Sequence, residues 1–459
     1  MKLNYKRTIL VGFAFFLISA FWQAYDAIIP LILSNHFGLP DVASGAIMSI
    51  DNILAVFLLP IFGAVSDRIN TKHGKRTPFI ICGTVVAILS FVALTFVDNY
   101  QLAKIIEAGV NTEPTTEAAM KAALQLTIEN PWPLIGFIAT LLVVLLAMAT
   151  FRSPAVALMP DVTVKPLRSK GNAIINLTGT AGGISVLVLG MVFGTAKDAF
   201  MEYTGYVIAV VAIMLLGLLV FVTTVKEKAW AAEMEAETER LGFNDTQESS
   251  VDGGRSLSRG EIKSLLLILA SVALWYIGYN SITSKYSVYS SNILKFDFNL
   301  TLIIAQIAAI ISYIPVGIIA SKIGRRKTIL AGVTILASAF FAGNFITSKS
   351  PEFLMVPIFI LAGIGWATIN VNSFPMVVEL AKGGEVGKYT GYYYTASMAA
   401  QIVAPILSGA LYDWFGMRAM FFAFGTLFVA LSFVTMLFVK HGDSKPEKTG
   451  ALESIGADD

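Results

Sequence analysis

The sequence predicts an all-α membrane protein with twelve transmembrane helices in two pseudo-symmetric six-helix halves. Three observations lead to this prediction. The 459-residue chain is 56% hydrophobic and only 14% charged, whereas soluble domains carry about a quarter charged residues. Apolar runs of about 20 residues, each long enough to cross a hydrocarbon core of ~30 Å, recur along most of the chain. A hydrophilic stretch, residues 226–261, separates the first six runs from the last six.

The apolar runs define the expected spans. The first is read as a retained helix, because it is too long for a signal-peptide core and lacks a small-residue cleavage site. In chain order the spans are expected at 9–33, 44–66, 78–97, 136–160, 172–195, 204–225, 262–288, 300–320, 328–347, 354–378, 388–412 and 417–439. Residues 98–135 contain an expected short surface helix.

The hydrophilic stretches divide the chain into domains. Residues 226–261 pass into a Ser/Gly/Asp-rich segment with the composition of a flexible linker. The expected organisation is therefore an N-terminal bundle, a cytoplasmic linker, a C-terminal bundle and a disordered cytoplasmic tail, at residues 1–225, 226–261, 262–440 and 441–459.

Basic residues predict the orientation. Most of the 33 lysine and arginine residues fall in loops on the same side as both termini. The positive-inside rule places that side in the cytoplasm of a multi-pass cell-membrane protein. The expected macromolecular partner is the lipid bilayer, because the net charge of +2 gives no indication of nucleic acid. A functional monomer is expected, and the single cysteine, Cys82, excludes an internal disulfide.

A charged loop with a distinctive pattern follows span 2. Residues 63–80 read GAVSDRINTKHGKRTPFI, and a shorter version, GIIASKIGRRK at 317–327, follows span 8. The same position in both halves indicates a duplicated element. In the second copy Ser321 stands where the first copy has an aspartate. The residues singled out in the two copies are Gly63, Asp67, Arg68, Arg76, Gly317, Arg325 and Arg326.

The chemistry of this loop predicts a latch between the two halves. Gly63 allows close helix packing, and the Asp67 carboxylate suits the positive N-terminal end of another helix. Together with the basic cluster, these residues would close the cytoplasmic side when the outer side is open. The alternative is that the basic residues only set the topology, but Gly63 and Asp67 are not needed for that.

The two loops resemble the loop signature of the major facilitator superfamily, Gly-x-x-x-Asp-Arg-x-Gly-Arg-Arg, and the resemblance covers essentially the whole chain. It implies a twelve-helix transporter in which Asp67 faces the start of span 11. The longer first loop, ending GKRTPFI, and the segment RSPAVALMPDVTVKPLRSKGNAI at 152–174 are similar to the glycoside–pentoside–hexuronide:cation symporters and the related sucrose transporters.

One departure from those symporters concerns the coupling ion. In the melibiose-type members, carboxylates on spans 2 and 4 hold sodium. The matching positions here are Ala55, Leu59 and Arg152, so the corresponding sodium ligands are missing. The expected coupling ion is therefore a proton rather than sodium.

Three ionisable residues lie within the expected spans: Asp26, Asp51 and Arg152. Such groups are costly in a bilayer and are functional candidates. Asp26 and Asp51 are almost equally far from the turn between spans 1 and 2, so the helical rise places them at similar depth. Two carboxylates and one guanidinium leave one negative charge, which a single proton would neutralise. The alternative is a structural Asp–Arg pair that locks spans together.

Aromatic and amide side chains on the cavity-lining spans form the expected substrate site. Sugars stack their C–H faces on aromatic rings and bond to amides through their hydroxyl groups. For each residue the alternative is helix–helix packing or contact with lipid. The expected substrate-binding residues are Trp22, Tyr25, Asn52, Trp275, Tyr279, Asn280, Trp366, Asn370 and Gln401. Lys285 is expected to snorkel, and His36 is expected to lie in a loop without a chemical role.

The predicted function is alternating-access, proton-coupled symport of a small-molecule solute, a sugar such as a disaccharide or glycoside. One alternative is a proton-coupled antiporter that exports amphipathic or drug-like compounds. Another is a sensor that binds solute without transporting it. The sequence contains no phosphate loop, metal-ligand cluster or nucleophile arrangement, so neither an enzyme nor a cofactor is expected.

Overall fold

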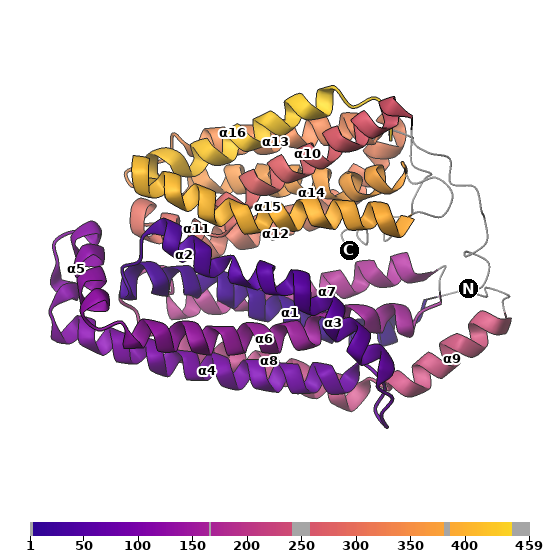
Figure 1. The fold of residues 1–459 in the computed structure, drawn as a ribbon, viewed down its shortest axis with the longest axis horizontal. Helices are drawn as coiled ribbons and strands as arrows, with labels where there is room; N and C mark the ends of the chain where they lie inside the picture. The colour runs from indigo at the N-terminus through magenta and orange to yellow at the C-terminus, as the bar shows by residue number, and fades with distance from the viewer. Residues whose placement is uncertain (1–2, 165–166, 241–257, 381–385, 443–459) are drawn as a thin grey trace.

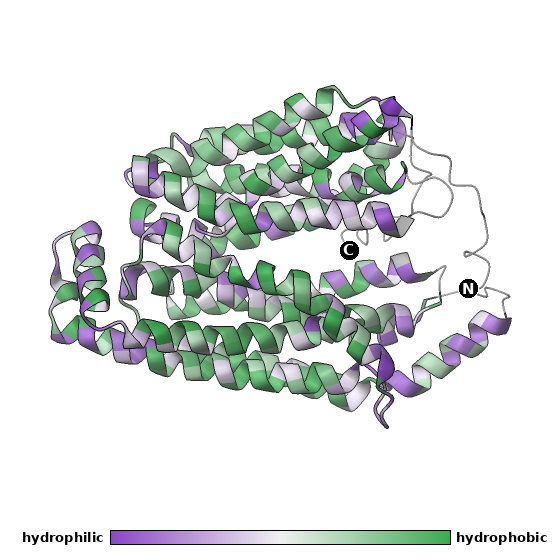
Figure 2. Ribbon diagram, viewed as in Figure 1, coloured by the Kyte–Doolittle hydropathy of each residue, from purple (hydrophilic) through white to green (hydrophobic). Residues whose placement is uncertain are grey.

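The computed structural model describes residues 3–164, 167–240, 258–380 and 386–442, and this part of the chain is built of helices. Two bundles lie side by side (Figure 1), an N-terminal half of α1–α8 and a C-terminal half of α10–α16. Among the described residues, twelve helices are long and apolar enough to cross a membrane, which confirms the predicted fold class. Figure 2 shows hydrophobic residues along these helices, whereas α9 is largely hydrophilic.

The N-terminal half follows the predicted order of spans. Its elements are α1 (Tyr5–Leu31), the π-helical turn η1 (Ile32–His36), α2 (Asp41–Met48), α3 (Ile50–Arg68), α4 (Thr77–Glu107), η2 (Val110–Thr112), α5 (Thr116–Glu129), α6 (Trp132–Asp161), α7 (Arg168–Phe193) and α8 (Thr204–Thr224). Helix α5 is the predicted surface helix. Span 2 consists of two helices, α2 and α3, separated at Ser49, and α4 extends ten residues beyond the expected end of span 3 at residue 97.

The linker region begins with a helix, α9 (Glu227–Arg240), and the C-terminal half follows. Its elements are α10 (Arg259–Thr283), α11 (Tyr286–Val288), the π-helical turn η5 (Tyr289–Leu294), α12 (Phe298–Ile323), α13 (Arg325–Gly343), η6 (Glu352–Leu354), α14 (Met355–Val378), α15 (Val386–Phe415) and α16 (Met417–Leu437). The predicted flexible segment at 241–257 and the predicted tail at 443–459 lie outside the described residues.

Spans 1 and 7, the first of each half, both end in π-helical turns, η1 and η5. Asn35 in η1 and Asn292 in η5 face each other, and the Asn292 Nδ2 donates to Asn35 Oδ1 at 2.6 Å. Both side chains are buried, so this pair joins the halves at corresponding positions. The η1 turn contacts α5, so the pair lies at the α5 end of the molecule. Helix α9 marks the opposite end (Figure 1).

Glycines allow some helices to approach closely. A Cβ atom on Gly63 would lie 2.9 Å from Ser153 Oγ of α6, so the close packing predicted for this residue is confirmed. Similarly, a Cβ on Gly182 in α7 would lie 2.5 Å from the Phe16 carbonyl oxygen of α1. Small residues at such contacts bring backbones together, which is the usual basis of helix packing in membranes.

Candidate functional site: two cavities between the halves

A small polar cavity of about 190 Å³ lies between the two halves. It brings together the three predicted intramembrane charges, Asp26 of α1, Asp51 of α3 and Arg152 of α6. Its walls come from α1, α2, α3 and α6 on one side and from α10 and α15 on the other. The lining residues are Trp22, Tyr25, Asp26, Met48, Asp51, Asn52, Arg152, Asn280, Thr283, Ser284, Gln401 and Pro405.

The charges in this cavity have distinct surroundings. Asp51 lies in the first turn of α3, where the helix dipole favours a negative charge, and its Oδ1 accepts a hydrogen bond of 2.8 Å from Asn52 Nδ2. The Arg152 guanidinium stands over the Trp22 ring, 5.8 Å from the ring centre, a geometry that favours a cation. Asp26 is exposed although its neighbours in α1 are buried, because its side chain faces the cavities.

A larger cavity of about 490 Å³ adjoins the first, and Trp22, Asp26 and Thr283 line both. Tyr279 and Trp366 are stacked on its wall, with ring centres 3.6 Å apart and planes within 7°. Much of the remaining lining is apolar, including Leu302, Ala305, Ala309, Ile310, Phe340, Phe359 and Ala362. The cavity volume falls in the range of small-molecule sites, ~300–1,000 Å³.

A hydrogen bond crosses this larger cavity from one half to the other. Gln306 Nε2 of α12 donates to Gln23 Oε1 of α1 at 2.7 Å, and both residues line the cavity. Neither was singled out from the sequence, although a glutamine inside an apolar span is a detectable signal. The pair offers a solute amide groups from both halves at once.

Most of the predicted substrate-binding residues line one of these cavities. Seven of them do so: Trp22, Tyr25, Asn52, Tyr279, Asn280, Trp366 and Gln401. Trp275 is instead fully buried in the packing of the C-terminal half. Asn370 lies on α14 away from both cavities, and its Oδ1 is buried without a partner.

Two predicted latch residues of the first half, Asp67 and Arg76, form an ion pair. Arg76 binds Asp67 at 2.5 Å and Asp161 at 2.8 Å, and it also donates to Ser66. Among the described residues, the ion-pair partner of Asp67 is thus Arg76 of its own half. Residues 381–385, just before α15, lie outside the described residues, so the contact of Asp67 with the start of span 11 stays a prediction. The neighbouring Arg68 is exposed.

The second copy of the loop also bonds within its own half. Arg325 binds Glu379 at 2.6 Å, and Arg326 donates to the Leu437 carbonyl oxygen at 2.5 Å. Gly317 is buried within α12. The side chain of Ser321, expected to make this copy the weaker latch, lies outside the described residues.

The long form of the first loop holds the linker helix. Glu227, at the start of α9, is 3% exposed, and its carboxylate accepts hydrogen bonds of 2.6–2.9 Å from the backbone N–H groups of Lys75, Arg76 and Thr77. Gly74 has φ +116°, and a Cβ there would lie 2.2 Å from the Glu227 carboxyl carbon. Because Thr77 begins α4, the linker supplies the carboxylate that caps this helix.

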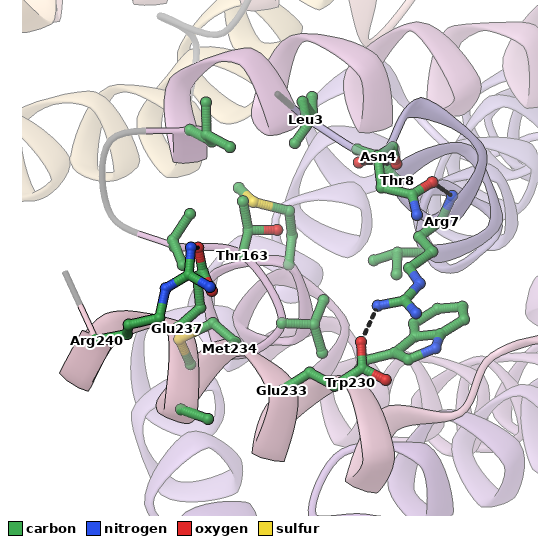
Figure 3. A pocket seen from close by; sticks show the side chains of 16 residues that line it. Leu3, Asn4, Arg7, Thr8, Thr163, Trp230, Glu233, Met234, Glu237 and Arg240 are labelled. Carbon is green, nitrogen blue, oxygen red and sulfur yellow. Dashed lines mark hydrogen bonds and ion pairs between the residues drawn. The ribbon is translucent and has the colours of Figure 1, made fainter. Parts of the chain in front are cut away.

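Helix α9 also contacts the start of α1, around a third cavity of about 570 Å³ (Figure 3). Arg7 forms an ion pair with Glu233 and stands over the Trp230 ring, 5.2 Å from its centre. The linker helix is therefore docked on the N-terminal half. This docking was not predicted from the sequence.

Two further charged residues differ from expectation. Lys285 does not snorkel to solvent; its side chain is fully buried and binds Asp41 of the other half at 2.9 Å. His36 is not an exposed loop residue; its Nδ1 lies 2.6 Å from Asp98 Oδ1, and both side chains are fully buried. Between η5 and α12, partial burial lowers the pKa of Lys295, whose Nζ donates to Thr116 of α5 at 3.0 Å.

A twelve-helix bundle with polar cavities between two similar halves is the architecture of a membrane transporter. The family model of the Major Facilitator Superfamily matches residues 11–311 and 295–457. The chain belongs to this superfamily, whose members are membrane transporters and not enzymes. Among the described residues, no group of three or more His, Cys, Asp or Glu side chains could hold a metal ion.

Three similar proteins illustrate the relationship. The MFS-type transporter ppzB of Metarhizium rileyi is 32% identical over 116 residues, but the match spans only 25% of this chain and 23% of the relative. An uncharacterized MFS-type transporter of Methanocaldococcus jannaschii is 22% identical over 95% of both chains. The inward-open xylose transporter XylE of E. coli has a TM-score of 0.65 at 14% identity, covering 98% of this chain and 99% of its own.

Proposed function

We propose that the protein is a proton-coupled symporter of a sugar, a disaccharide or glycoside, that works by alternating access. The observation that carries this proposal is the convergence of Asp26, Asp51 and Arg152 with aromatic and amide groups in cavities between the halves. These residue types support coupling to protons and binding of a neutral polar solute. The structural likeness to a sugar transporter is consistent with this class of solute.

Proton coupling follows from the charge balance of the smaller cavity. Arg152 offsets one of the two carboxylates, and one negative charge remains. Closing a cavity around an unpaired charge is costly, because the charge loses its water. Protonation of Asp26 or Asp51 would remove that cost, so the loaded carrier rearranges after it has gained a proton.

The larger cavity supplies the groups that suit a sugar. The stacked Tyr279 and Trp366 rings present an aromatic surface to the C–H face of a pyranose ring. Gln23 and Gln306 offer amides to the hydroxyl groups, and a bound sugar would replace the bond between them. Because the two glutamines belong to different halves, the sugar would contact both and couple its own binding to their movement.

The orientation follows from the distribution of basic residues. The α9 end, with its arginine clusters, would face the cytoplasm of a cell-membrane protein, and the α5 end would face outside. In this orientation the bonds between halves at the α5 end close the outer side. In this conformation the protein would then receive or release solute on the cytoplasmic side.

A second function is favoured by the apolar lining of the larger cavity. Leu302, Ile310 and Phe359 would accept the apolar part of an amphipathic compound, and the carboxylates would supply the proton for its exchange. This alternative is a proton-coupled exporter. It predicts that apolar compounds, not sugars, raise the thermal stability of the purified protein, since a ligand stabilises the state that binds it.

The proposal is tested by transport into proteoliposomes. An imposed inward proton gradient is expected to drive sugar accumulation without sodium. Asp51→Asn imitates the protonated carboxyl group, so sugar exchange should persist while accumulation is lost. Arg152→Ala should abolish both, because removing one partner of buried opposite charges typically costs ~3–5 kcal/mol.

Asp198→Asn is the matched control, because Asp198 is an exposed aspartate in the loop between α7 and α8. It should transport like the unmodified protein. Sodium-driven uptake without proton movement would contradict the coupling scheme. Binding of solute without any transport would favour the sensor.

A further inference from the structure

Helix α2 of the N-terminal half lies against α15 of the C-terminal half at the α5 end. A Cβ on Gly45 would lie 2.2 Å from the Pro405 carbonyl oxygen, and one on Gly409 would lie 2.5 Å from the Asp41 carbonyl oxygen. The two backbones therefore touch at a glycine on each helix. At the other end of α2, Ser49 Oγ donates to the Ile402 carbonyl oxygen at 2.9 Å.

The N-terminus of α2 is capped by a carboxylate from the other half. Asp413, near the end of α15, accepts hydrogen bonds of 2.8 Å from the backbone N–H groups of Asp41 and Val42. The first N–H groups of a helix lack partners within the helix, and the residue at the cap position of α2, Pro40, makes no side-chain bond to them. Asp413 thus supplies the cap that α2 lacks, and its charge favours the helix terminus.

A second charge from the C-terminal half reaches the same helix start. Lys285, between α10 and α11, binds the Asp41 side chain at 2.9 Å. The Tyr412 hydroxyl donates to the Ser281 carbonyl oxygen at 3.2 Å and so ties α15 to α10. Asp413 on α15 and Lys285 in the turn after α10 therefore belong to connected parts of one half, and both bind α2.

This contact also forms part of the wall of the charged cavity. Met48, the last residue of α2, and Pro405 of α15 both line the smaller cavity. Separation of α2 from α15 would therefore open this cavity toward the α5 end. We propose that Asp413 is the clasp of an outer gate: its carboxylate caps α2 while the gate is closed and releases it when the cavity opens.

This role of Asp413 rests on the proposed alternating access and adds Asp413 to the residues that take part in it. Asp413 of span 11 caps the start of span 2 at the α5 end. The predicted latch would place Asp67 of span 2 at the start of span 11, at the α9 end. The same two spans thus offer a carboxylate and a helix start at each end, and each conformation would use one of the two.

The test measures access to the cavity from the α5 side. Thr283, which lines both cavities, is replaced by cysteine in a Cys82→Ser background and labelled with a membrane-impermeant maleimide. A cysteine at exposed Gln125 on α5 reports which vesicle face is the α5 side. Asp413→Asn removes the negative charge and turns one of the two acceptor oxygens into an amide donor that faces a backbone N–H group. It should raise the labelling rate of Thr283→Cys from that side about fivefold, an effect of the size of losing a helix cap.

The control is Thr115→Ala, which removes the N-terminal cap of α5 within a single half and should leave the rate unchanged. Ser49→Ala removes one bond of the same α2–α15 contact and should raise the labelling rate less than Asp413→Asn does. It is the replacement variant if Asp413→Asn does not fold. An unchanged labelling rate in a folded Asp413→Asn variant would contradict the proposed role of Asp413. If that variant does not fold, an unchanged labelling rate in Ser49→Ala would contradict it. Because labelling needs no solute or proton gradient, this result is separate from failure of the transport proposal.

Discussion

The two ends of the molecule are held together in different ways. At the α5 end, Lys285 and Asp413 of the C-terminal half bind α2 of the N-terminal half, and the Lys285 side chain is fully buried. At the α9 end, Arg76 and Arg325 each form ion pairs within their own half. Asp67, the expected latch at this end, is 61% exposed. The halves are thus joined at one end by a fully buried lysine and an exposed aspartate, whereas these latch charges at the other end stay inside a half.

This difference indicates how one sequence would support two conformations. Ion pairs that cross between halves must break when the halves separate, and buried ones cost the most to break. Arg76 already has partners in its own half, so it does not lose all its bonds when the α9 end opens. The charges at the α5 end would therefore set the stability of this conformation. Variants at each end can test that assignment.

The largest effect is expected at the buried pair of the α5 end. Lys285→Met leaves the Asp41 carboxylate without its ammonium partner and should lower the free energy of unfolding by about 3 kcal/mol. Thermal unfolding in detergent measures the change. Lys121→Met is the matched control, because its pair with Glu117 is 75% and 80% exposed, and exposed pairs contribute ~0–1 kcal/mol. Equal losses in both variants would contradict the special role of this end.

A smaller effect is expected where the linker helix meets the N-terminal half. Glu227→Gln keeps the size of the side chain but turns one acceptor oxygen into a donor that faces backbone N–H groups. Loss of such buried bonds typically costs ~1–3 kcal/mol. Limited proteolysis should then cut α9 faster, whereas Glu237→Gln on the same helix should not change the rate. Unchanged cleavage of Glu227→Gln would show that this carboxylate does not hold α9.

The features that sequence alone revealed are those set by local pattern. Apolar runs located the twelve spans, and the helical rise brought Asp26 and Asp51 to one cavity because both are counted from the same turn. The long first loop was recognised, but its partner Glu227 lies 150 residues further along the chain from Thr77. A partner at that distance leaves no periodic signal.

The charged contacts at the α5 end were missed for the same reason. Lys285 and Asp41 are 244 residues apart, and Asp413 is 372 residues from Asp41. His36 and Asp98 are 62 residues apart, and the π-helical turn that buries His36 has no clear sequence pattern. Trp275 was predicted to bind substrate but is fully buried, since an aromatic residue on a cavity-lining span can still point into its own half.

The smallest change in stability is expected for Asp67→Asn, because its carboxylate is mostly exposed and such pairs contribute under ~1 kcal/mol. Its effect should instead appear in the balance between conformations. Loss of the predicted latch would favour molecules whose α9 end is open. Ser321→Ala, at the corresponding position of the second copy, should have much less effect.

The most direct test of alternating access measures distances across both ends of the molecule in lipid nanodiscs by double electron–electron resonance. One label pair, at Glu117 and Lys349, spans the α5 end, and another, at His73 and Lys327, spans the α9 end; all four residues are exposed. The account predicts that a short α5-end distance accompanies a long α9-end distance, and that Asp67→Asn raises the share of this conformation. Two distances that lengthen together would contradict it, as would distances that both stay fixed in a protein that transports solute in proteoliposomes.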